Sequence, residues 1–174
     1  QYRDQWVTGL SECEIEVTGV NIGGPYLPSE LYNYDPERFK YYGEPYAYDS
    51  IMRIIYMEVQ TSEPTPDMFV AAFPKMDYDF AGHDIIFFDL LIGSCEPFEY
   101  TTIITENMPY YICAAAFDYK GDVTPLWMSE PIDWRDVEPR PIEELIEKID
   151  ASEANIMMLA IGADGKVSSI SPVR

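Results

Sequence analysis

The sequence predicts a mainly β protein, an antiparallel sandwich that carries one short helix and a hairpin at its C-terminal end. Between residues 51 and 132, short apolar segments recur at intervals of roughly 10 to 15 residues, which is typical of strands in a sandwich. Breaks rich in proline, glycine or acidic residues separate these segments. No apolar pattern with the helical period occurs before residue 140, so we expect the strands to pair antiparallel in two packed layers.

The first expected strand covers residues 11–22. Cys13, Ile15 and Val17 alternate there with glutamates, and this alternation predicts one buried face and one face in solvent. The strand is expected to end at the Gly-Gly-Pro sequence that starts at residue 23.

Residues 25–48 are rich in tyrosine and proline and are expected to form a long ordered loop. Proline at this density disfavours both a helix and a central strand, and a loop this long is unusual unless it is functional. Four neighbouring rings are the candidate ligand-binding residues, because tyrosine stacks well on sugar faces: Tyr41, Tyr42, Tyr46 and Tyr48. The favoured interpretation is that these rings cover a face of the sheet.

Strands of the sandwich are expected at residues 51–61, 68–73, 85–92, 98–105 and 110–117, with a short one within 126–132. The acidic segment 77–84 is expected to be a loop. Asp77, Asp79 and Asp84 offer the hard oxygen ligands that calcium prefers, so they are the candidate metal ligands. The segment lacks the regular spacing of a calcium-binding loop, and solvated loop acids are the favoured interpretation.

A helix is predicted from residue 141, with a single apolar face made of Ile142, Leu145, Ile146 and Ile149. Pro141 suits the first helical turn, and a helix of about three turns must dock on something to be stable. Beyond it, apolar runs at 156–161 and 167–170 flank an Asp-Gly pair, which predicts a terminal hairpin.

These elements divide the chain into three expected parts. Residues 1–48 hold the lead strand and the tyrosine-rich loop, 49–135 form the sandwich, and 136–174 form a connector, the helix and the hairpin. The hairpin either packs beside the sandwich or completes a second β unit with residues 1–48. The two layouts differ in whether residues 15 and 159 lie in the same sheet.

Composition narrows the classes of function. The formal net charge is −20, from 31 acidic and 11 basic residues, and no basic cluster offsets it. Nucleic-acid binding requires a basic patch that releases counterions, so we expect no nucleic-acid partner. No apolar run approaches the roughly 18 residues of a membrane-spanning helix. Cys13, Cys95 and Cys113 are too few for a disulfide-built scaffold, and their disulfide state is left open.

Catalysis finds little support in the sequence. His83 is the single histidine, and it lies in an expected Gly-His-Asp turn without a nucleophile signature nearby. With so many acids, a pair of carboxylates of the glycosidase type stays an alternative. We expect a non-catalytic chain without a cofactor, calcium being the one ion considered.

The segment 104–121 resembles the E–F corner and F strand of fibronectin type III domains. That family has an aliphatic residue six before a tyrosine, apolar residues two, four and six after it, and a glycine eleven after it. The matching positions are Ile104, Tyr110, Ile112, Ala114, Ala116 and Gly121. A second register, in which Tyr111 and Cys113 match immunoglobulin domains, is disfavoured because residues 51–61 hold no cysteine to pair with.

More loosely, the arrangement is similar to fibronectin-like repeats of secreted lipoproteins from gut Bacteroidetes. The resemblance implies a fibronectin type III-like sandwich in the periplasm or on the outer-membrane surface, lipid-anchored upstream of residue 1. It implies a binding or spacer module whose partner is a glycan or protein at the cell surface, and it supplies no catalytic residues. The alternatives are a carboxylate-dependent glycoside hydrolase and a calcium-dependent adhesion domain.

Overall fold

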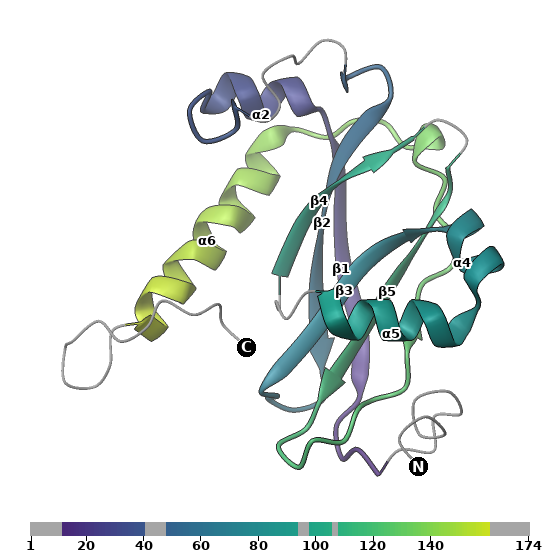
Figure 1. Ribbon diagram of the computed structural model, residues 1–174. Coiled ribbons are helices and arrows are strands. Elements are labelled where there is room, and N and C mark those ends of the chain that lie inside the picture. The colour runs from purple at the N-terminus through teal and green to yellow at the C-terminus, as the bar shows by residue number, and fades with distance from the viewer. Residues whose placement is uncertain (1–11, 41–47, 94–97, 106–107, 161–174) are drawn as a thin grey trace.

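The computed structural model describes residues 12–40, 48–93, 98–105 and 108–160, and Figure 1 shows their arrangement. Along the chain the elements are β1 Val17–Tyr26, α2 Pro28–Tyr34, β2 Met52–Thr61, β3 Asp67–Pro74, α4 Lys75–Ala81, α5 His83–Gly93, β4 Phe98–Ile104, β5 Tyr110–Phe117, β6 Trp127–Met128, the 3-10 turn η2 Trp134–Asp136, and α6 Ile142–Ala160.

In the described part of the chain, the strands form two antiparallel three-stranded sheets, in the orders β1-β2-β4 and β3-β5-β6. Val20 lies opposite Val59 in the first sheet, and Val70 lies opposite Ala114 in the second. The prediction of a mainly β chain with antiparallel strands is therefore confirmed. Apart from the segment 85–92, the predicted strands from residue 51 onward correspond closely to β2, β3, β4, β5 and β6.

The two sheets share one hydrophobic core. Alternate residues of β2 (Ile55, Met57 and Val59) meet inward-facing side chains of β3, β4 and β5 together with Trp134. The period-two alternation in residues 51–61 is the pattern that places one face of β2 in this core. The packing is sandwich-like.

The opposite face of the first sheet is covered by α2 and α6. Ile54 of β2 packs with Leu31 of α2 and with Leu145 and Ile149 of α6. The predicted helix therefore exists and docks through its predicted apolar face. Helix α6 continues to Ala160 and is therefore longer than the expected three turns.

Residues 156–160 belong to α6, so the predicted terminal hairpin is wrong in its first half. No proline or glycine interrupts residues 142–160, and the run of Ile, Met, Leu and Ala at its end favours a helix. Residue 159 is helical and shares no sheet with residue 15. Residues 161–174, the rest of the expected hairpin, lie outside the described residues.

The outer face of the second sheet is covered by α4 and α5, where a strand and a loop were expected. Residues 85–92 form most of α5, and the acidic segment 77–84 lies in α4 and the start of α5. An apolar run of this length does not distinguish a buried strand from a helix. The small side chain of Ala115 in β5 leaves room for Phe87 and Leu90 of α5 to pack against the sheet.

The start of the chain also differs from expectation. Strand β1 begins at Val17 and continues through the two glycines to Tyr26. Gly23 is required within the strand, because the ring of Tyr56 occupies the space that a Cβ atom would take. Residues 12–16 precede the strand, although Ile15 is buried and the neighbouring glutamates are exposed, as the alternation predicts.

The expected long loop at 25–48 contains α2. Pro28 lies in the first turn of this helix, where its missing N–H has no cost. Within the described residues, none of the helices combines the length and the apolar character needed to cross a bilayer.

Candidate functional site

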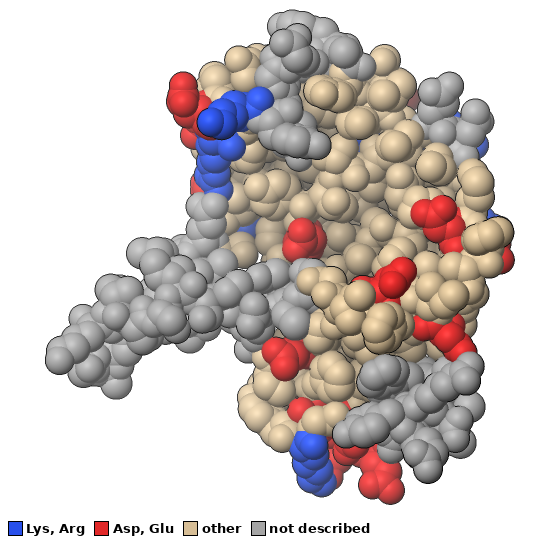
Figure 2. All heavy atoms as spheres, in the orientation of Figure 1, with Lys and Arg blue, Asp and Glu red and all other residues tan. Residues whose placement is uncertain are grey.

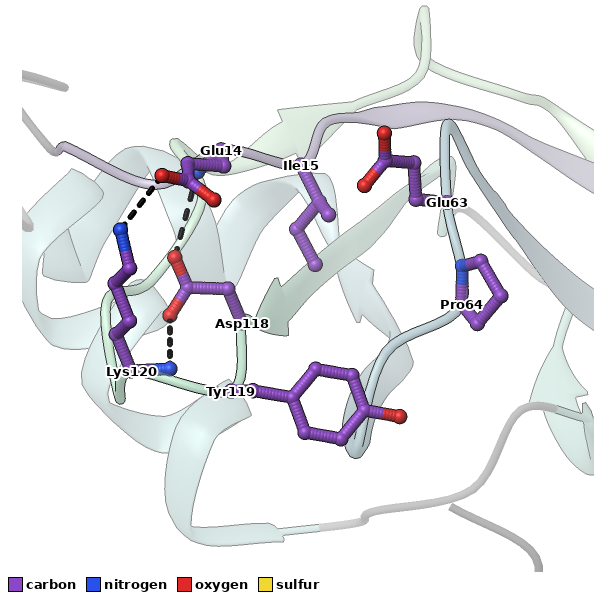
Figure 3. Close-up of a pocket in the computed structure, with 7 residues that line it drawn as sticks. All are labelled: Glu14, Ile15, Glu63, Pro64, Asp118, Tyr119 and Lys120. Carbon is purple, nitrogen blue, oxygen red and sulfur yellow. Dashed lines mark hydrogen bonds and ion pairs between the residues drawn. The ribbon is translucent and has the colours of Figure 1, made fainter.

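A pocket of about 340 Å³ opens at one end of the sandwich. The segment before β1, the β2–β3 turn and the β5–β6 turn meet there (Figure 3). Among the described residues, seven line the pocket: Glu14, Ile15, Glu63, Pro64, Asp118, Tyr119 and Lys120.

The β5–β6 turn is organised by the carboxylate of Asp118. It accepts hydrogen bonds from the backbone N–H of Lys120 at 2.9 Å and of Asp122 at 3.0 Å, as an Asx-type turn does. Gly121 completes the turn with a φ of 89°, a conformation that glycine adopts without strain.

Asp118 also holds the segment before β1 against the turn. Its second carboxylate oxygen accepts from the backbone N–H of Glu14 at 3.3 Å, and the Asp118 carboxylate also interacts with the Cys13 thiol. Desolvation raises the pKa of Asp118, but the backbone hydrogen bonds from Asp122, Glu14 and Lys120 outweigh it and hold the pKa below its usual value. Asp118 is therefore an ionised structural anchor.

An exposed ion pair closes one side of the pocket. Lys120 Nζ lies 2.6 Å from Glu14 Oε1, and both side chains are well exposed. Such a pair adds little stability, but it neutralises one of the carboxylates that face the pocket.

The β2–β3 turn forms the opposite wall and is tied to both of its neighbours. The backbone N–H of Ser62 donates to the carbonyl of Glu16 at 2.9 Å, and the Ser62 hydroxyl accepts from the Glu16 N–H at 2.9 Å. The buried Thr65 hydroxyl donates to the carbonyl of Phe117. These bonds fix Glu63 and Pro64 relative to Tyr119.

The groups that a ligand would meet are an aromatic ring and carboxylates. Tyr119 is 78% exposed, and Figure 3 shows its ring turned away from Lys120 toward Pro64. Ile15 points into the space between Asp118 and Glu63. An aromatic face can stack on the C–H face of a sugar, and carboxylate oxygens can accept hydrogen bonds from its hydroxyl groups.

Of the four tyrosines predicted to bind a ligand, Tyr48 lies among the described residues, and it does not line this pocket. Tyr48 is half-buried and precedes β2, whereas Glu63 follows β2, so the two residues lie at opposite ends of that strand. Tyr41, Tyr42 and Tyr46 lie outside the described residues.

The predicted metal ligands are distributed over two helices. Asp77 and Asp79 lie on α4, where Asp79 pairs with Lys75, and Asp84 lies in the first turn of α5. Over the ranges that the structure describes, no three His, Cys, Asp or Glu side chains are grouped so that they could hold a metal ion. Helices α4 and α5 thus do not form the calcium loop considered above.

The described cysteines are poor nucleophiles. Burial raises the pKa of the Cys113 thiol to about 12, so the thiol stays protonated near neutral pH. Cys13 is half-buried and its pKa is raised as well, chiefly by desolvation. The His83 ring packs against the ring of Phe87, and its Nδ1 lies 3.7 Å from Oδ1 of Asp84. His83 is remote in sequence from both of the described cysteines.

Sequence reasoning missed this pocket because it depends on the meeting of three separated segments. The one feature of the sequence that could have indicated the pocket is an aromatic residue, Tyr119, within an Asp-x-x-Gly sequence that is typical of a turn. Comparison of the chain with known protein families, with curated proteins and with solved structures found no match.

Proposed function

We propose that this chain is a non-catalytic binding module with a fibronectin type III-like sandwich, and that it binds a glycan in the pocket beside Tyr119. The observation that carries the proposal is the exposed Tyr119 ring, held on a fixed turn in the same pocket as the exposed carboxylates of Glu14 and Glu63. As the resemblance implies, the module is extracytoplasmic and acts in the periplasm or on the outer-membrane surface.

The strand order supports the fibronectin type III-like fold. The sheets β1-β2-β4 and β3-β5-β6 correspond to A-B-E and C-F-G, with α4 and α5 in the connection between C and E. The buried Tyr110 is consistent with a tyrosine corner, because its hydroxyl accepts from the backbone N–H of Ile104 at 3.0 Å.

In this fold the pocket lies at the end that carries the B–C and F–G loops. Antibody variable domains use loops at the same end to bind their ligands. The site therefore combines a rigid scaffold with exposed turns, which is the usual arrangement of a binding site.

A neutral or amino sugar fits the pocket best. A volume of about 340 Å³ is near the lower end of the usual range for small-ligand sites, so the pocket accommodates a short stretch of an oligosaccharide. The acidic character of the chain, with a net charge of −20, disfavours sulfated or uronic-acid glycans.

A non-catalytic role is consistent with how the polar groups are used. The Asp118 carboxylate is occupied by backbone N–H groups, and Glu14 pairs with Lys120. Neither group is free to act as a general acid without first breaking these contacts.

Glycan-array binding by the full chain tests the proposal. We expect Tyr119→Ala to lose the neutral glycans bound by the wild type, and Tyr34→Ala, which changes an exposed ring on α2, to keep them. Loss with Tyr41→Ala and Tyr42→Ala instead would move the site to the tyrosine-rich segment. Equal binding by the wild type and Tyr119→Ala would refute the proposed pocket.

The presence of Glu14 and Glu63 in one pocket favours a second candidate, a carboxylate-dependent glycoside hydrolase. Release of reducing sugar from a bound glycan, lost in Glu63→Gln, would support it. A binding module releases none. Repeating the glycan-array measurement with a calcium chelator tests the calcium-dependent alternative. We expect glycan binding to survive chelation, whereas a calcium-dependent adhesion domain would lose it.

A further inference from the structure

Helices α4 and α5 present an apolar surface to solvent. Ile85, Phe88 and Ile92 follow one another at the spacing of a single helix face, and each is at least half exposed. On the same helical pair Met76 is more than half exposed, and the Phe80 side chain is 94% exposed. We call these five residues the α4–α5 face.

This surface is not needed to cover the sheet. The opposite side of α5, with Ile86, Phe87 and Leu90, already packs on β3 and β5. The helix is therefore apolar on both sides, whereas a helix that only covers a sheet keeps a polar face toward water. Extended exposed apolar surface of this kind marks a site of interaction.

Acidic residues are interspersed with the apolar residues along α4 and α5, and three of them, Asp77, Asp79 and Asp89, are exposed. Residues 75–93 contain Asp77, Asp79, Asp84 and Asp89 against one basic residue, Lys75, whose ammonium group is paired with Asp79. Figure 2 shows this side of the molecule as mostly uncharged surface with separate acidic groups. The rim of the α4–α5 face is therefore negative.

We infer that the α4–α5 face docks a segment of another protein that carries apolar side chains flanked by lysine or arginine. An amphipathic helix fits this chemistry, because its apolar residues recur at the same spacing as those of α5 and its basic flanks meet the aspartates. The inference is independent of the proposed glycan site, since the α4–α5 face lies on the solvent side of helices that cover β3 and β5 and includes no residue of the pocket.

Other occupants of this surface are disfavoured by charge. A second copy of the chain would bring two negative rims together, in addition to the net charge of −20 on each copy. A membrane rich in anionic lipid would be repelled for the same reason.

The test uses fluorescence anisotropy with the full chain and a labelled synthetic peptide. The peptide is a helix of about fifteen residues with leucines on one face and lysines at its flanks. A matched peptide has glutamate in place of each lysine. The Phe80→Ala/Phe88→Ala variant removes two exposed rings and should stay folded, which circular dichroism verifies, and Tyr34→Ala is the control for loss of an exposed ring elsewhere.

We expect the basic peptide to bind wild type and Tyr34→Ala alike, at least about tenfold more tightly than it binds Phe80→Ala/Phe88→Ala. Added salt and Asp77→Asn/Asp89→Asn should weaken this binding. The inference would be overturned if the wild type bound the acidic peptide as tightly as the basic one, or if it did not bind the basic peptide. It would also be overturned if the basic peptide bound Phe80→Ala/Phe88→Ala as tightly as the wild type. Dimerisation, or flotation with phosphatidylserine vesicles, that depends on Phe80 and Phe88 would overturn it too.

Discussion

Removal of a single oxygen atom from Tyr110 tests how the two sheets are joined. The Tyr110 side chain is only 6% exposed, and its hydroxyl accepts from the backbone N–H of Ile104, at the end of β4. Tyr110→Phe keeps the ring in the core between the sheets and removes only this contact. The variant thereby loses one hydrogen bond between the end of β4 and the start of β5.

The magnitude follows from the exposure of the donor. A lost intramolecular hydrogen bond costs about 0.5–1.5 kcal/mol, and an unsatisfied buried donor costs more. Because this hydrogen bond is only part-buried, water can partly replace the hydroxyl, and we expect a loss of about 1 kcal/mol. For a chain of this size the melting temperature should fall by roughly 2–4 °C. Tyr110→Ala, which also empties the core, should cost about 3–5 kcal/mol.

Urea denaturation of the wild type and the variants measures these differences. The matched control is Tyr119→Phe, which removes the hydroxyl of an exposed ring and should change stability by less than about 0.5 kcal/mol. The proposed corner would be refuted if Tyr110→Phe were as stable as Tyr119→Phe.

Three further predictions concern buried or anchored groups. Cys113 should resist thiol reagents until the chain unfolds, because burial raises its pKa to about 12; peptide mapping that finds it labelled in the native chain would contradict this. Ala115→Leu should destabilise the chain by about 1–3 kcal/mol in urea, because the larger side chain intrudes between β5 and α5; an unchanged midpoint would mean that the helix packs loosely. The folded-state pKa of Asp118 is lowered, so its contribution to stability is complete above about pH 4 and is lost as the pH falls through the folded-state pKa. Asp118→Asn should therefore lose less stability than the wild type on acidification, and parallel pH profiles would show that the carboxylate is not the anchor.

The secondary structure could be predicted where a residue pattern is compatible with only one type of element. Alternation along β2 and the proline-led start of α6 were both foreseen from local residues. Helix α5 was missed because apolar residues on both of its sides hide the helical period. Its exposed side chains, such as Phe88, belong to the surface for which we propose a partner.

The site was harder to predict for a different reason. The turn at Asp118 and Gly121 was recognisable from its residues, but its approach to Glu14 and Glu63 depends on how distant segments pair. Likewise, Gly23 was expected to end the first strand, but it lies within β1, where the Tyr56 ring fills the space that a side chain would need. Neither contact is encoded in a short stretch of sequence.

The glycan site is most directly tested by a heteronuclear NMR titration of the isotopically labelled full chain with neutral oligosaccharides from the array. We expect amide shifts to be concentrated at residues 14–15, 63–64 and 118–120, the three segments that line the pocket, and to disappear in Tyr119→Ala. Shifts centred on residues 41–48, or none at saturating sugar, would contradict the account.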